Sequence, residues 1–360
     1  MPAGTGKARR LSRDLFSEGA ALPACAVRHN ISRAPRDRRP PERPARGDQM
    51  PAREAARERV AYFNGKIVPE SQARVSFRDR GFLYGDAVFD TTRTFGHRIF
   101  KLDEHIDRFF RSLKYVQIDP GLSAKQLKDI TMQVTEANLK LIGPDDDYWV
   151  SQRISRGYRT PEGDPPLFEG PTVIVECMPL SLRARARLFR DGIDVIVPST
   201  RRTPPESVSP RAKTHNYLNL TLGDMEAKAR DPEAWAVLLD TRGFLAEGTG
   251  SNIFTVKDGA VYTPRNQYVL GGISRETVFE LAQKLDIPLK EADLDLYDAA
   301  TADEIFLTST SLCICGVRSL NGAQVGNGAP PGPVTKALTD AYIELVSYDF
   351  VGQHLKRLEG

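Results

Sequence analysis

The chain has 360 residues, of which 40% are hydrophobic and 27% charged, a composition typical of a globular protein long enough for two domains. It contains no run of about eighteen or more apolar residues, which excludes a membrane-spanning helix. Residues 1–59 carry 14 basic and 7 acidic residues, and the remainder carries 36 basic and 40 acidic residues, so nothing there indicates nucleic-acid binding. The four cysteines are few and irregularly placed. They predict no metal site and fit a reducing cytoplasm.

Residues 1–58 are predicted to be a disordered basic tail, because they are rich in arginine, proline and alanine and lack a sustained apolar period. Acidic residues are too frequent in this segment for a typical organelle-targeting leader. Weak binding to polyanions is a second possibility. We prefer the interpretation that the start codon has been assigned too early and that Met50 is the natural start.

Residues 59–178 are predicted to form a small α/β domain. Asn64 and Gly65 between apolar residues are typical of a tight hairpin turn. Asp103 is expected to cap a helix. The other expected elements are a hairpin that pairs 81–94 with 98–102, a helix at 124–141, and strands at 148–154 and 172–177. Residues 179–191 are predicted to be an interdomain linker.

Residues 192–360 are predicted to form a larger domain, which makes the chain an α+β protein with mixed sheets. Ser274 is expected to cap one of its helices. The expected strands are 193–198, 234–240, 251–257, 260–263 and 304–314, and the expected helices are 217–229, 274–285 and 334–346. Cys313 and Cys315 are expected to lie on one face of the strand at 304–314.

Two segments of this domain could carry amine chemistry. Lys213 lies in the sequence RAKTHNY just before a predicted helix, and a lysine that forms a Schiff base needs such a fixed, polar position. Glu247 begins the sequence EGTGSN, where a buried carboxylate could keep a pyridine nitrogen protonated and small residues let the backbone run beneath a flat ring. Taken alone, the first segment also fits a solvated surface lysine and the second an ordinary glycine-rich loop.

Two further segments could bind an anion. Residues 270–275 (LGGISR) begin a predicted helix, whose free N–H groups and dipole suit a phosphate. Residues 306–311 (FLTSTS) place hydroxyl groups at the end of an apolar strand. Each feature is weak by itself, since many helix starts offer N–H groups and hydroxyls often cap strands.

The order of these four segments resembles the class IV aminotransferases, which depend on pyridoxal 5'-phosphate. This family includes branched-chain aminotransferases, D-amino acid aminotransferases, (R)-amine transaminases and aminodeoxychorismate lyases. The resemblance runs from about residue 62 to residue 356 and includes the segments 79–90, 103–108, 247–252, 272–275 and 332–336. It implies a homodimer with the two-domain D-amino acid aminotransferase-like fold, in which the larger, cofactor-binding domain contains a mixed, pseudo-barrel sheet.

The resemblance also implies roles for individual residues. Lys213 would carry pyridoxal phosphate covalently and move the proton at the substrate Cα, while Glu247 would pair with the pyridine nitrogen. Tyr217 would lie near the ring hydroxyl, although branched-chain enzymes usually place one more residue between the lysine and the tyrosine. The cofactor phosphate would be held by Arg108, Gly272, Ile273, Ser274 and Thr310.

Substrate features point in two directions. Residues 88–93 (VFDTTR) stand where branched-chain enzymes usually read VFEGxR, so that Thr91 replaces the glycine and is expected to narrow the pocket. The lysine–tyrosine spacing and the segment around Arg159 are closer to the D-amino acid and (R)-amine members, but the Arg-x-His pattern of the D-amino acid enzymes is absent. A solvated loop position for Arg159 is at least as well supported. The residues expected to contact substrate are Phe89, Thr91, Arg93, Arg159 and Ser311.

The predicted activity is transfer of an amino group to a 2-oxo acid such as 2-oxoglutarate or pyruvate by a ping-pong mechanism. A branched-chain L-amino acid is the preferred donor. An (R)-selective amine or D-amino acid transaminase is the main alternative, and an aminodeoxychorismate lyase is a less favoured one. A non-enzymatic pyridoxal phosphate carrier would bind the cofactor without reacting with any amine.

Overall fold

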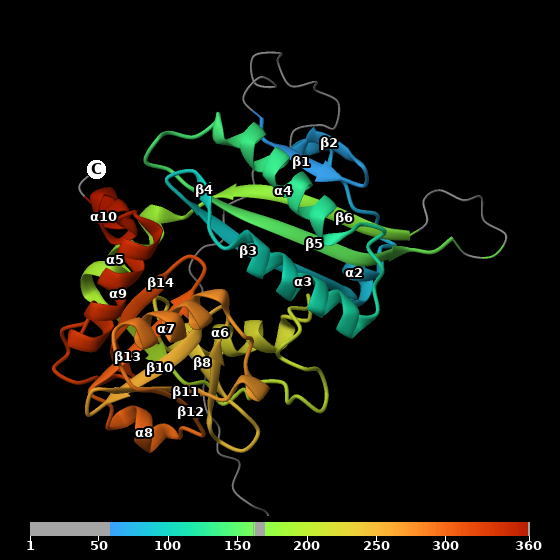
Figure 1. The fold of residues 1–360 in the computed structure, drawn as a ribbon. Helices are drawn as coiled ribbons and strands as arrows, with labels where there is room; N and C mark the ends of the chain where they lie inside the picture. The colour runs from blue at the N-terminus through green and yellow to red at the C-terminus, as the bar shows by residue number, and fades with distance from the viewer. Residues whose placement is uncertain (1–57, 161, 163–169, 359–360) are drawn as a thin grey trace, which may run out of the picture. The chain divides into compact units, whose positions relative to one another are not determined.

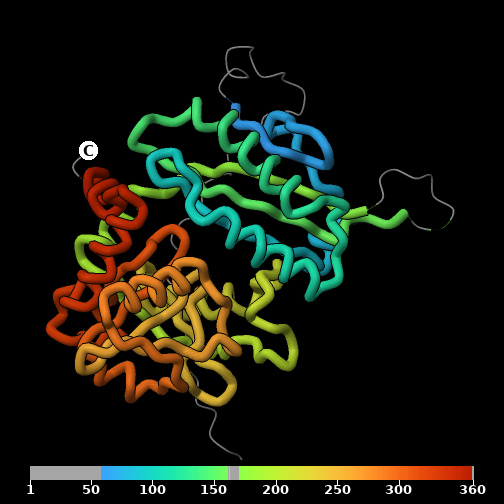
Figure 2. The backbone as a smooth tube through the Cα atoms, in the orientation of Figure 1, coloured from blue at the N-terminus to red at the C-terminus, as the bar shows by residue number. Residues whose placement is uncertain are grey.

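Two β-sheets, which we call the first and the second sheet, organise the computed structural model (Figures 1 and 2). The structure describes residues 58–160, 162 and 170–358. All of them belong to the unit Pro51–Gly360. The predicted basic tail, apart from Glu58, and Cys25 lie outside the described residues.

The first sheet has six strands in the order β2-β1-β6-β5-β3-β4, and all neighbours are antiparallel. Its strands are β1 (Val60–Phe63), β2 (Lys66–Pro69), β3 (Ala87–Phe95), β4 (Arg98–Ile99), β5 (Tyr148–Tyr158) and β6 (Gly170–Pro179). Asn64 and Gly65, both with positive φ, join β1 to β2, which confirms the predicted hairpin turn.

Helices α3 (Leu102–Val116) and α4 (Ala124–Leu139) cover one face of the first sheet (Figure 1). Phe109 and Leu127 from these helices pack with Val150 and other alternate strand residues in one buried cluster. Because side chains alternate along a strand, β3 directs its odd-numbered residues from Phe89 onward to the opposite face. That second face of β3 lines the pocket described below.

The second sheet has nine strands and closes on itself. Its path runs β12-β11-β10-β13-β14-β7-β8-β9, with β15 on β14, and a pairing of Asn252 with Glu247 joins β9 back to β10. Parallel pairs occur within a largely antiparallel ladder, as expected for a mixed pseudo-barrel. The strands are β7 (Ile193–Ile196), β8 (Trp235–Leu239), β9 (Leu245–Gly248), β10 (Asn252–Lys257), β11 (Ala260–Pro264), β12 (Leu289–Ala292), β13 (Glu304–Ser309), β14 (Cys313–Leu320) and β15 (Ala323–Gln324).

The remaining helices pack around these sheets: α2 (Arg80–Tyr84), α5 (Leu182–Asp191), α6 (Leu218–Arg230), α7 (Ile273–Lys284), α8 (Leu296–Ala300), α9 (Pro333–Val346) and α10 (Phe350–Leu355). Helix α5 occupies most of the segment predicted as a linker and packs against α10 and β14. The division at 178 and 192 stays a prediction. Among the described residues, no helix has both the length and the apolar character needed to cross a bilayer.

Two predicted helix caps are wrong. Helix α3 begins one residue before Asp103, and Lys101 in the left-handed region is its N-cap, so Asp103 lies in the first turn. Helix α7 has Gly272 as its N-cap, which makes Ser274 its second residue. In both first turns the side chain still lies close to free N–H groups, where polar residues are favourable.

Two predicted strands are interrupted. The segment 81–94 starts with helix α2, because the Asp79 carboxylate accepts from the Gly81 N–H and Gly85 ends the helix in the left-handed region. The segment 304–314 is a hairpin, in which the Leu312 N–H donates to Ser309 Oγ at 3.1 Å. Cys313 has a φ of 58° and packs in a different buried cluster from Cys315, so the expectation that the two thiols share one face was wrong.

Candidate active site

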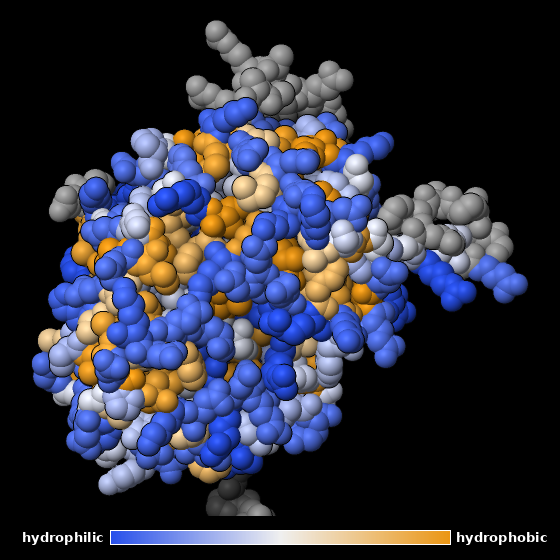
Figure 3. All heavy atoms as spheres, in the orientation of Figure 1, coloured by the Kyte–Doolittle hydropathy of each residue, from blue (hydrophilic) through white to orange (hydrophobic). Residues whose placement is uncertain are grey.

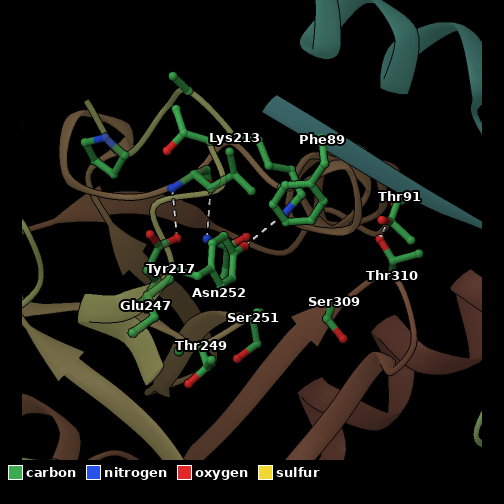
Figure 4. A pocket seen from close by; sticks show the side chains of 18 of the residues that line it. Phe89, Thr91, Lys213, Tyr217, Glu247, Thr249, Ser251, Asn252, Ser309 and Thr310 are labelled. Carbon is green, nitrogen blue, oxygen red and sulfur yellow. Dashed lines mark hydrogen bonds between the residues drawn. The ribbon is translucent and has the colours of Figure 1, made fainter. Parts of the chain in front are cut away.

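A cavity of about 480 Å³ is lined by most of the residues singled out in the sequence (Figure 4). Its walls come from β3, β5, α3, residues 202–220, the β9–β10 turn, the loop before α7 and the turn between β13 and β14. Eleven of the thirteen predicted site residues line it: Phe89, Thr91, Arg108, Lys213, Tyr217, Glu247, Gly272, Ile273, Ser274, Thr310 and Ser311.

Lys213 is held at the junction between β3 and α3. Its backbone N–H donates to Ser112 Oγ at 3.0 Å, and its carbonyl accepts from the Phe89 N–H at 3.0 Å. The Nζ atom lies 3.2 Å from the Tyr217 hydroxyl and 4.4 Å from the centroid of the Phe89 ring. Lys213 forms no salt bridge within the described part of the chain, so no carboxylate competes for its amine.

Glu247 lies on β9 where the second sheet closes, and only 5% of it is exposed. Its Oε1 accepts from Arg202 Nε at 2.9 Å, and its Oε2 accepts from the Leu270 N–H at 2.9 Å. The arginine and the backbone donor therefore orient the carboxylate from two sides. Sequence reasoning missed Arg202, because nothing in its surroundings (TRRT) has a recognisable pattern.

Gly272 and Asn252 pack closely at the wall of the cavity. A Cβ on Gly272 would lie 2.2 Å from Asn252 Oδ1, so a larger residue there would displace the Asn252 side chain. The Asn252 amide donates to the Leu270 carbonyl at 2.9 Å and ties the loop before α7 to β10. The small residues 248–251, which follow Glu247, also line the cavity, and their place beneath a cofactor ring stays a prediction.

One end of the cavity carries groups that could bind an anion. The Arg108 guanidinium, from α3, binds both oxygens of Asp90 at 2.7 and 2.8 Å and donates to the Gly271 carbonyl at 2.9 Å. The first N–H groups of α7 are free of helical partners and belong to the same end. Burial raises the pKa of Asp90, but Arg108 and His105 lower it by more and hold it well below its usual range. Asp90, which sequence reasoning also missed, therefore anchors Arg108.

Three buried hydroxyl oxygens of the cavity wall have no hydrogen-bond partner within the described residues: Thr249, Ser251 and Thr308. A buried polar atom without a partner costs about 1–3 kcal/mol, so these groups suit a polar ligand. Pyridoxal phosphate would meet the anion-binding end with its phosphate, Lys213 with its aldehyde and Glu247 with its ring nitrogen. The residues present therefore fit this cofactor.

Two predicted substrate residues lie outside the cavity. Arg93 is on the same face of β3 as Phe89 and Thr91, but it is buried, binds Gln353 and backbone carbonyls and does not line the cavity, so its contact with substrate stays a prediction. Arg159 is exposed at the end of β5 and does not line the cavity. The orientation of Arg93 is set by tertiary contacts that a motif does not show.

Known proteins share this chain's sequence and fold. A Methanocaldococcus jannaschii protein assigned by name to the branched-chain aminotransferases is 36% identical over 285 residues, which cover 79% of this chain and 95% of that protein. The D-alanine aminotransferase of Staphylococcus haemolyticus is 29% identical over 284 residues, covering 78% and 95%. A solved T.th. branched-chain amino acid aminotransferase, complexed with N-(5'-phosphopyridoxyl)-L-glutamate, superposes with a TM-score of 0.71 at 27% identity, covering 81% and 94%.

The sequence model of the family described as Amino-transferase class IV matches residues 87–320. This range contains the cavity's two ionic anchors, Asp90 and Glu247, as well as Lys213. Family, fold and cavity agree with the resemblance noted in the sequence. The chain belongs to the class IV aminotransferases and is a pyridoxal-phosphate-dependent transaminase.

Proposed function

We propose that this transaminase takes branched-chain L-amino acids as amino donors and passes the amino group to 2-oxoglutarate or pyruvate by a ping-pong mechanism. The observation that carries the proposal is the charge state of the cavity. Both arginines among its described lining residues are engaged by carboxylates, Arg108 by Asp90 and Arg202 by Glu247. Phe89 and Trp149 add aromatic surface to the cavity wall, and Arg153 and Arg185, which lie over these two rings, do not line the cavity, so this wall suits an apolar substrate side chain.

Similarity in sequence supports the same donor class. The Methanocaldococcus jannaschii relative carries a branched-chain aminotransferase name, and residues 88–93 follow the branched-chain pattern except at two positions. Thr91 replaces a glycine there, and its Oγ1 lies 2.9 Å from Ser151 Oγ. We expect the extra side chain to restrict the size of the accepted donors.

Bound pyridoxal phosphate supplies an electron sink for the charge that remains when the substrate Cα loses its proton. We assign the movement of that proton to Lys213, whose amine has no competing carboxylate in the described chain. The Tyr217 hydroxyl, 3.2 Å from Nζ, would orient the amine. Glu247 would keep the ring nitrogen protonated, because a nearby negative charge stabilises the cation.

We assign cofactor retention to the anion-binding end of the cavity. Arg108, the N–H groups of Ile273 and Ser274, and the Thr310 hydroxyl would bind the phosphate. The Thr310 hydroxyl donates to the Thr91 carbonyl at 3.0 Å in this structure, so it would have to rotate to donate to the phosphate. Ser311 would face the substrate from the same turn.

A D-amino acid or (R)-amine transaminase is the second candidate. The D-alanine aminotransferase relative covers nearly the same part of the chain, and the lysine–tyrosine spacing is closer to that group. The cofactor contacts would be identical in both cases. The stereochemistry of the donor is therefore the property that experiment has to decide.

We also propose a homodimer, as the family resemblance implies. Helices α2 and α6 expose large apolar side chains, and the Asn216 amide, just before α6, donates to the carbonyl of Gly85, the C-cap of α2. Phe82 is 73% exposed, Leu218 71% and Met225 62%, more than a single-copy surface usually leaves in one region. Figure 3 shows apolar side chains at the surface in the region of α2. The free, buried thiols of Cys177, Cys313 and Cys315 favour a reducing compartment such as the cytoplasm.

Absorbance of the bound cofactor tests the donor class directly. The holoenzyme is mixed with L-leucine, L-valine, D-alanine, D-leucine and both enantiomers of a chiral aryl amine, and each half-reaction is followed in the absence of acceptor. Reaction with the branched-chain L-amino acids at the highest kcat/KM supports the proposal. A preference for D-amino acids or (R)-amines replaces it with the second candidate, and spectra that no amine changes would indicate a cofactor carrier.

A further inference from the structure

The last α-helix of the described chain, α10, connects to the active site through a buried network of polar side chains. Arg93, Asp147 and Gln353 have exposures of 1%, 1% and 5%, and they come from β3, the loop before β5 and α10. None of them lines the cavity. Their contacts nevertheless end on a residue that does, Ser311.

Arg93 uses its donors in three directions. Nε donates to the Thr94 carbonyl at 3.0 Å and NH2 to Gln353 Oε1 at 3.0 Å. NH1 donates to the Ser311 carbonyl at 3.4 Å, and the guanidinium lies 4.1 Å from the centroid of the Phe95 ring. Such a buried, fork-shaped cation holds its partners in a narrow range of geometries.

Gln353 joins Arg93 to its counter-charge. The Gln353 amide donates to Asp147 Oδ2 at 2.8 Å and to the Asp145 carbonyl at 3.1 Å, which leaves its oxygen for Arg93. Asp147 also accepts from the Thr94 hydroxyl at 2.5 Å and lies 3.7 Å from Arg93 NH2. The carboxylate therefore neutralises Arg93 while Gln353 sets its orientation.

Strand β3 forms hydrogen bonds with the turn between β13 and β14 at two neighbouring points. The Thr91 carbonyl accepts from the Thr310 hydroxyl at 3.0 Å, and Arg93, two residues further along β3, donates to the Ser311 carbonyl. The hydrogen bond between Thr310 and Thr91 thus holds the turn directly, whereas the one between Arg93 and Ser311 depends on the buried network. Thr310 and Ser311 are the residues of this turn to which cofactor and substrate contacts are assigned.

We infer that Gln353 is a positioning residue of the active site: through Arg93 it fixes the turn 309–311, so that helix α10 sets the affinity for the amino donor. Arg93 then serves as a clamp behind the pocket wall rather than as a substrate ligand. The inference depends on the transaminase activity but not on which amino donor is used.

Gln353→Met tests this inference, because it keeps the length and packing of the side chain and removes its hydrogen bonds. The holoenzyme is studied by stopped-flow half-reactions with its best donor. We expect the half-saturating donor concentration to rise about tenfold, the effect of losing one charge-assisted hydrogen bond, while the maximal rate stays within about threefold. Gln353→Asn, which retains an amide that is too short for both contacts, should show a smaller rise and provides the measurement if Gln353→Met does not fold.

Val351→Ala is the matched control, since Val351 is on the same helix and packs against the apolar cluster instead of the polar network. It should lower the melting temperature without changing the half-saturating concentration. The inference is overturned if a folded Gln353 variant keeps donor affinity within twofold of wild type. It is also overturned if Val351→Ala weakens donor binding as much, because loosening α10 would then be sufficient.

Discussion

The carboxylate of Glu247 can be tested by the substitution Glu247→Gln, which keeps the size of the side chain and removes its charge. The substitution also changes the hydrogen bonds of this side chain. Both carboxylate oxygens accept hydrogen bonds, one from Arg202 and one from the Leu270 N–H. A glutamine has one acceptor oxygen, so its NH2 group must face one of these donors, at a cost of about 1–3 kcal/mol in folding free energy.

The effect on the reaction should be larger. Without the negative charge the pyridine nitrogen loses the interaction that keeps it protonated, and removal of the Cα proton becomes harder. We expect turnover to fall by two to four orders of magnitude, about 3–5 kcal/mol of barrier. The cofactor should remain bound, since Lys213 and the phosphate contacts are untouched.

Stopped-flow absorbance with a protiated and a Cα-deuterated donor measures the relevant step. The variant should show a slowed half-reaction with a larger isotope effect than wild type, because proton removal then limits the rate. Arg202→Gln provides the control, as it retains the carboxylate and removes only its partner, and it should slow the reaction far less. If Glu247→Gln reacts within a few-fold of wild type, Glu247 is only part of a turn and the proposed electronic role is refuted.

Three further predictions follow from the same geometry. Borohydride reduction should label Lys213, and Lys213→Ala should lose the label and at least about four orders of magnitude in turnover; a label elsewhere would contradict the assignment. Asp90→Asn should weaken cofactor retention in dialysis about ten- to a hundredfold, because Arg108 loses its charged anchor, whereas unchanged retention would show that Asp90 is dispensable. Burial, together with the positive charges of Arg153 and Lys213, lowers the pKa of His215 to about 4. Between about pH 4 and 6.5 the imidazole is therefore protonated in the unfolded chain and neutral in the folded chain. Unfolding free energy should therefore fall as pH drops through this window, and His215→Phe should reduce that fall by about 1–3 kcal/mol; identical pH profiles for variant and wild type would show that His215 does not titrate in this way.

Much of the local structure follows from patterns within a few residues. The Asn64–Gly65 turn, the helix α9 and the strands β8 and β10 occur where apolar periodicity and turn residues predicted them, whereas β9, which contains Glu247, was predicted as a loop. Most errors arose where a short contact overrode the pattern. The Asp79 cap of α2 and the positive φ at Cys313 are two such contacts, and both interrupt segments that alternate like strands.

Part of the candidate site could likewise be predicted, because some of its residues lie in recognisable local patterns. Lys213 and Tyr217 are four positions apart, and Glu247 stands in a run of small residues, so each carries a local signal. Arg202 carries none, although it lies 2.9 Å from Glu247 after a separation of 45 residues. The contact of Arg93 with Gln353 spans 260 residues, and it holds a residue of the 88–93 motif in a buried polar network.

The sequence by itself therefore determined the family and the type of many elements, and it singled out Lys213 and Glu247 as candidate cofactor residues, because propensity, periodicity and motif order act over short distances. The tertiary structure decided which charges are paired, which hydroxyls lack partners and which way each arginine points. These properties depend on side chains that meet only when two sheets and their helices are packed together. Side chains far apart in the sequence meet because the second sheet closes on itself and because successive residues of β3 face opposite sides of its sheet. Neither feature can be read from a single local segment.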